Sequence, residues 1–62
     1  MKARDWQKYL EEQHRLHDKS LFTVTELANV AHTSRSALNV ELTRLRRQGL
    51  VARYAHGQYG LP

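Results

Sequence analysis

The stretch Thr33–Val51 places the strongest constraint on the fold, because it has the pattern of one amphipathic helix closed at both ends. At about 100° per residue, three leucines fall on the same side of this helix. They are Leu38, Leu42 and Leu45. Ser34 is a typical N-cap residue, and Gly49 can adopt the left-handed conformation that ends a helix. The stretch therefore predicts a helix over residues 35–48 whose leucine side packs against the rest of the chain.

The opposite side of this helix mixes polar, basic and small side chains that packing does not require. They are Ser36, Asn39, Val40, Thr43, Arg44 and Arg47. One interpretation is a solvated face, in which Arg44, Arg46 and Arg47 in the last two turns stabilise the negative end of the helix dipole. The other interpretation is an interface with a partner.

Two further helices are predicted upstream. Residues 3–17 place four apolar side chains near one face, namely Trp6, Tyr9, Leu10 and Leu16. Thr23 and Glu26 have the spacing of a capping box, in which each side chain bonds the other residue's free backbone amide. These two residues begin a predicted amphipathic helix over residues 24–31. Leu21–Thr23, just before it, has the composition of a short strand.

The chain after the leucine-rich helix has the pattern of a β-hairpin. Two strand-like runs, Leu50–Tyr54 and Gln58–Leu61, flank a turn in which Gly57 supplies conformational freedom. We therefore expect a hairpin over residues 50–61. Its Tyr54 is expected to pack in the core, as are the two aromatic rings of the first helix.

Size and charge restrict the function. The 62 residues suffice for one domain, over residues 1–62, and the absence of cysteine leaves it without a stabilising disulfide. The formal net charge is +4, and from Leu27 onward five arginines face a single acidic residue, Glu41. This balance favours an anionic partner, most commonly nucleic acid. We find no apolar run that could span a membrane and no signal-peptide pattern, and we expect a cytoplasmic protein without membrane contact.

The order of helix, extended piece, helix, turn, helix and hairpin predicts an α+β fold. Two helices joined by a turn of three or four residues, the second longer and basic, have the layout of a helix-turn-helix. The hairpin that follows makes it a winged helix. In this layout the helix over 35–48 is the recognition helix, and its polar side is free to enter the major groove of double-stranded DNA.

The segment "FTVTELANVAHTSRSALNVELTRLRRQGLVARYAHGQYGLP" resembles the winged helix-turn-helix of bacterial transcriptional regulators. Its ending, G-x-Y-x-L-P from Gly57 to Pro62, is similar to the N-terminal domain of AbiEi-type antitoxins. The resemblance implies that the third helix reads bases and that the wing contacts phosphate or the minor groove. It marks Arg35, Ser36, Asn39 and Thr43 as groove candidates, and Arg53, His56 and Gln58 as wing candidates.

Other residues complete the predicted DNA interface. Arg44 and Arg47 are expected on phosphates, where they position the protein without specifying a sequence. Ser34 caps the helix end whose free amides attract anions. Val40 can pack on a thymine methyl group. One such helix reads only a few base pairs, so we expect a homodimer or a partner protein domain to add specificity.

A different class of function also fits the sequence. A winged helix that serves as a protein-interaction module, in an antitoxin or a larger assembly, would use Val40 and the nearby Ala37 against an apolar patch. Non-specific binding of RNA or DNA is a third interpretation.

An enzyme is not expected, because no nucleophile sits at a strained turn and no glycine loop can hold a phosphate chain. His14 and His17 are too few for a metal site, and no cofactor is needed.

Overall fold

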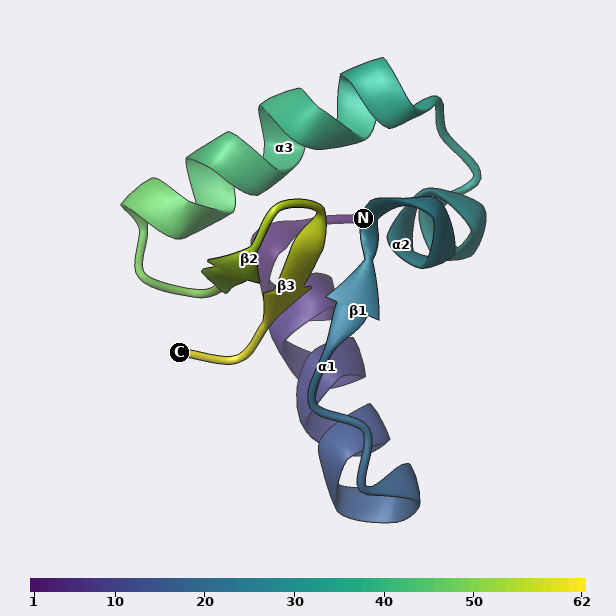
Figure 1. Ribbon diagram of the computed structural model, residues 1–62, viewed down its shortest axis with the longest axis vertical. Helices are drawn as coiled ribbons and strands as arrows, with labels where there is room; N and C mark the ends of the chain where they lie inside the picture. The colour runs from purple at the N-terminus through teal and green to yellow at the C-terminus, as the bar shows by residue number, and fades with distance from the viewer.

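The computed structural model describes residues 1–62 as three helices and a three-stranded antiparallel sheet (Figure 1). The elements, in chain order, are α1 (Ala3–His17), β1 (Phe22–Thr23), α2 (Val24–Ala31), α3 (Arg35–Arg47), β2 (Ala52–Ala55) and β3 (Gln58–Gly60). This arrangement confirms the predicted α+β winged-helix fold, including the short strand before α2. The predicted helix over 35–48 is one residue shorter, because Gln48 is the C-cap.

The helix ends follow the predicted caps. Ser34 Oγ accepts a hydrogen bond from the amide of Ala37 at 3.1 Å, and Thr23 Oγ1 accepts one from the amide of Glu26 at the same distance. The return bond of the predicted capping box is absent. The carboxylate of Glu26 instead lies 3.2 Å from the ammonium of Lys19, because this stronger charged partner competes for it. Half of the predicted box is therefore present.

The sheet has the order β1-β3-β2, so that the last strand lies in the middle. Tyr59 of β3 pairs with Phe22 on one side and with Arg53 on the other. The hairpin between β2 and β3 turns at Gly57, whose φ of +74° confirms the predicted need for glycine. A bulge between Arg53 and Ala55 inserts one extra residue into β2.

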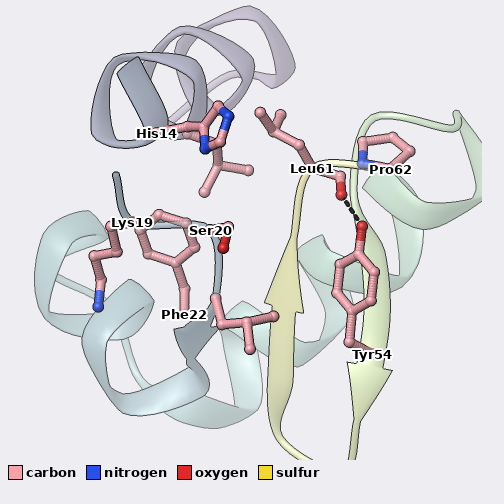
Figure 2. A pocket seen from close by; sticks show the side chains of 9 residues that line it. His14, Lys19, Ser20, Phe22, Tyr54, Leu61 and Pro62 are labelled. Atoms are coloured by element: carbon pink, nitrogen blue, oxygen red, sulfur yellow. Dashed lines mark hydrogen bonds between the residues drawn. The ribbon is translucent and has the colours of Figure 1, made fainter. Parts of the chain in front are cut away.

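Tyr54 is that extra residue, and its predicted place in the core is wrong. The side chain is 54% exposed. Figure 2 shows its ring beside the end of the chain, where the hydroxyl donates a hydrogen bond to the carbonyl oxygen of Leu61. Tyr59, in the central strand, fills the core instead. Arg53 pairs directly with Tyr59, so Tyr54, the next residue along β2, lies on the opposite side of the sheet from Tyr59.

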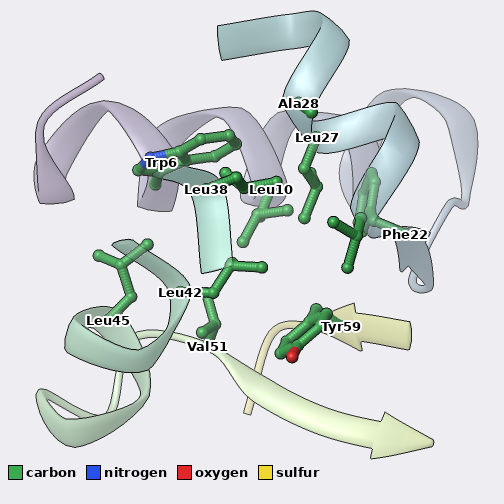
Figure 3. Close-up of a cluster of buried hydrophobic side chains, with 11 residues drawn as sticks. Trp6, Leu10, Phe22, Leu27, Ala28, Leu38, Leu42, Leu45, Val51 and Tyr59 are labelled. Atoms are coloured by element: carbon green, nitrogen blue, oxygen red, sulfur yellow. The ribbon is translucent and has the colours of Figure 1, made fainter. Parts of the chain in front are cut away.

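One cluster of eleven buried apolar side chains forms the core (Figure 3). Its members are Trp6, Leu10, Phe22, Val24, Leu27, Ala28, Leu38, Leu42, Leu45, Val51 and Tyr59. The three leucines of α3 are at most 2% exposed, which confirms their predicted role. Leu16, in contrast, was expected on the buried face of α1 and is 60% exposed. The last turn of α1 projects beyond the other helices and the sheet (Figure 1).

Candidate nucleic-acid interface

The burial of its leucines orients α3 and leaves its polar side in solvent. Figure 1 shows α3 along one edge of the molecule, with no other element beyond it. All six residues predicted on this side are exposed, namely Ser36, Asn39, Val40, Thr43, Arg44 and Arg47. Val40 is the most exposed large apolar side chain, at 63%. Arg35, at the start of the helix, is exposed as well.

Hydrogen bonds within α3 limit what two of its hydroxyl groups can offer a ligand. Ser34 Oγ already accepts the amide of Ala37, as an N-cap does. Thr43 Oγ1 donates its proton to the carbonyl oxygen of Asn39 at 2.9 Å. A hydroxyl has a single proton, so Thr43 presents only acceptor lone pairs to a partner.

The basic side chains of α3 and the wing have no acidic partner within the chain. The ion pair of the structure joins Lys19 and Glu26, outside this surface. Glu41, the one acidic residue of α3, faces α1 and accepts a hydrogen bond from Trp6 Nε1 at 2.7 Å. This contact fixes α1 against α3 and turns the carboxylate away from the arginines. The positive charge of α3 is therefore free for an outside anion.

The wing presents the three side chains that the family resemblance marked. Arg53, His56 and Gln58 are all exposed. The guanidinium of Arg53 donates to Nδ1 of His56, with Nη2 and Nδ1 3.0 Å apart. This bond orients the arginine from the tip of the hairpin, where the turn holds His56 beside Gly57.

The structure brings the wing and the end of α3 together around an open cleft of about 440 Å³. Its lining consists of Thr43, Arg46, Arg47, Val51, Ala52 and Arg53. Arg46 is the residue that sequence reasoning assigned only to the helix dipole. Its place beside β2 depends on the direction that the chain takes after Gly49, which the glycine alone does not specify.

The two ends of the predicted interface lie apart. Ser34 and Arg35 begin α3, whereas Arg46 stands eleven positions further on, which is about 17 Å along a helix. The candidate interface is thus an elongated surface over α3 and the wing. It is not a single pocket.

A second cavity, of about 480 Å³, lies between α1, the segment before β1 and the end of the chain (Figure 2). Its lining is Leu10, His14, Lys19, Ser20, Leu21, Phe22, Tyr54, Leu61 and Pro62. None of the predicted DNA-contacting residues is among them.

The structure holds no group of three His, Cys, Asp or Glu side chains suited to a metal ion. None of its helices is both long and apolar enough to span a membrane.

Comparison with known families decides the relationship. The sequence model of a family described as "Transcriptional regulator, AbiEi antitoxin" matches residues 7–62. The chain belongs to the AbiEi antitoxin family of transcriptional regulators. This membership confirms the resemblance seen from Phe22 onward, extends it to most of α1, and supports a regulatory role in general. No curated protein and no solved structure gives a significant match.

Proposed function

We propose that this AbiEi-family chain binds double-stranded DNA in a sequence-specific manner and so regulates transcription. The observation that carries the proposal is the open polar side of α3, whose arginines have no acidic partner and which continues into a basic wing. A helix with one side buried and the other polar and basic suits the major groove. The proposed ligand implies a cytoplasmic protein. The proposal assigns the chain neither a cofactor nor a catalytic step.

Base reading falls to the first three turns of α3. Arg35 and Asn39 have the donor geometry that suits guanine and adenine edges respectively, and Ser36 lies between them. Thr43 adds an acceptor, which suits the amino groups of cytosine or adenine. Val40 packs on a thymine methyl group.

Positioning falls to groups that contact the sugar-phosphate backbone. Arg44 and Arg47 lie in the last turns of α3, and the capped helix start at Ser34 attracts a second phosphate. The wing adds Arg53, His56 and Gln58 on the backbone or in the minor groove. Because α3 reads only a few base pairs, a second copy or a partner domain completes the specificity.

A protein-interaction module is the second candidate, and the exposure of Val40 favours it. At 63% exposure in the middle of the open side, this valine is an apolar contact point for a partner protein. The arginines around Val40 have no acidic partner, and charged side chains at the edge of an apolar docking site add little to its affinity. They therefore favour DNA as the ligand.

Salt titration distinguishes the two candidates. If four to six basic groups meet phosphates, log affinity for DNA falls with log salt at a slope of roughly −4 to −5. Asn39→Ala should weaken binding to a selected sequence by about 1–3 kcal/mol and leave a scrambled duplex nearly unaffected. Arg47→Ala should weaken both duplexes and flatten the slope by about one unit. If DNA binding is undetectable at low salt and a partner protein protects Val40 instead, the proposed regulator function is wrong and the chain is a protein-interaction module.

A further inference from the structure

The cleft between the last turn of α3 and the start of β2, here called the arginine cleft, has a fixed framework. Only Gln48–Val51 connects the two elements. The amide of Gly49 donates a hydrogen bond to the carbonyl oxygen of Arg46 at 3.0 Å. The amide of Leu50 donates one to the carbonyl oxygen of Leu45 at the same distance. Val51 is then buried in the core. These anchors hold the two walls at a set separation, so the site is present before any ligand arrives.

The charges in the arginine cleft have no counterpart within the chain. Arg46 and Arg47 come from α3, Arg53 comes from β2, and no acidic residue lines the cleft. None of the three takes part in an ion pair. Three guanidinium groups around one space repel one another unless an anion lies between them. The bond from Arg53 to His56 holds one of the three in place at the rim.

The hydrogen-bonding character of the lining selects the ligand. The remaining side chains are those of Val51 and Ala52, which are apolar, and of Thr43, whose proton is already donated to its own helix. Every side-chain N–H that faces the cleft therefore belongs to an arginine. A guanine edge also offers two acceptors to an arginine, but only a phosphodiester adds a negative charge, which three arginines around one space favour. Guanidinium forks match the oxygens of a phosphate.

We propose that the arginine cleft binds one phosphodiester of the DNA backbone, clamped between Arg46 of α3 and Arg53 of β2. This inference rests on the DNA-binding function proposed for the chain and adds Arg46 to its contacts. The 13 residues of α3 span about 20 Å, more than the major-groove width of about 12 Å. With the first turns on the bases, the last turn meets the backbone at the edge of the groove. The C-terminal third of α3 thus grips the backbone while the N-terminal part reads sequence.

The first test compares Arg46→Gln with Arg15→Gln in the full chain. Both change one exposed arginine of a helix to a residue of similar helix propensity, but Arg15 lies on α1, outside the cleft. On any duplex, Arg46→Gln should flatten the salt slope by about one unit and weaken binding about tenfold at low salt, whereas Arg15→Gln should leave the slope unchanged. Equal slopes in the two variants, at unchanged melting temperature, would overturn the proposal.

A second variant separates fixed geometry from mere charge. Arg46→Lys keeps the positive charge but loses the planar fork. We expect the salt slope to stay as in the wild type and the affinity to fall about threefold. Full affinity in this variant would show a diffuse electrostatic contribution, which contradicts a clamped phosphate.

The decisive measurement pairs protein variants with DNA in which single phosphates are replaced by neutral methylphosphonates, on a duplex obtained by selection from a random library. One position should weaken wild-type binding about tenfold and Arg46→Gln clearly less, because only Arg53 still holds that phosphate in the variant, while other positions affect both proteins equally. If neutralising a phosphate and replacing Arg46 act independently at every position, the proposal that the arginine cleft binds a phosphate is wrong, but the DNA-binding function is not affected. Absence of wild-type DNA binding would overturn the proposed function as well, so the two failures are distinguishable.

Discussion

Gly60 shows how a single position can be fixed by a distant part of the backbone. It lies buried in β3, and a Cβ atom added there would overlap the carbonyl oxygen of Ser20. We expect Gly60→Ala to destabilise the protein by about 1–3 kcal/mol, because backbone cannot yield as a flexible side chain does. Urea denaturation of the purified variant measures this loss.

Gly49 provides the matched comparison. Its φ is +75°, but nothing lies within 4 Å of an added Cβ. Gly49→Ala should therefore cost about 1 kcal/mol through backbone strain alone. Asparagine tolerates the left-handed region, so Gly49→Asn should recover part of the stability, whereas Gly60→Asn should be worse than Gly60→Ala. If the asparagine variants are more stable than the alanine variants at both positions, steric overlap is not the reason that position 60 requires glycine.

The tip of the hairpin between β2 and β3 depends on its turn rather than on packing. Gly57 has a φ of +74° and open space around it, so a β-branched side chain is strained there by backbone conformation only. Gly57→Val should distort the tip, displace His56 and Arg53, and weaken DNA binding while the core stays folded. Fluorescence anisotropy gives the affinity, and the dispersion of the NMR spectrum gives the fold.

Gly57→Asn is the control for this element, because asparagine adopts positive φ more readily than valine. It should retain most of the affinity. If Gly57→Val distorts the tip by NMR and still binds DNA as tightly as the wild type, the wing has no part in the interface.

The small core makes the stability of the protein sensitive to one leucine. Leu42 is 1% exposed and lies between α1, α2 and the sheet (Figure 3). Leu42→Ala should cost about 2–5 kcal/mol, a large part of the roughly 3–9 kcal/mol that a chain of this length has. Thermal unfolding followed by circular dichroism should show a strongly lowered midpoint or no transition.

Leu16→Ala is the comparison within the same molecule. Leu16 is also in a helix but lies on the projecting last turn of α1, so its loss should change the stability by no more than about 0.5 kcal/mol. Similar midpoints for the two variants would contradict the burial of the α3 leucines.

The sequence by itself determined the elements and their ends. The spacing of leucines, the caps at Thr23 and Ser34, and the glycines at positions 49 and 57 act within a few residues, so their effects are visible in a local pattern. The predicted helices, the strand before α2 and the hairpin followed from such signals. The side of α3 left open to solvent followed as well, because helical periodicity sets it.

Tertiary structure alone decided which side chains meet across the molecule. Trp6 and Glu41, 35 positions apart, form a hydrogen bond that no local pattern announces, and this contact removes the one carboxylate from the open side of α3. The pairing of Arg53 with Tyr59 placed Tyr54 outside the core, and the connection after Gln48 brought Arg46 and Arg53 to one cleft. Such contacts depend on how whole elements pack, because their energy comes from surfaces that meet only after the chain has folded.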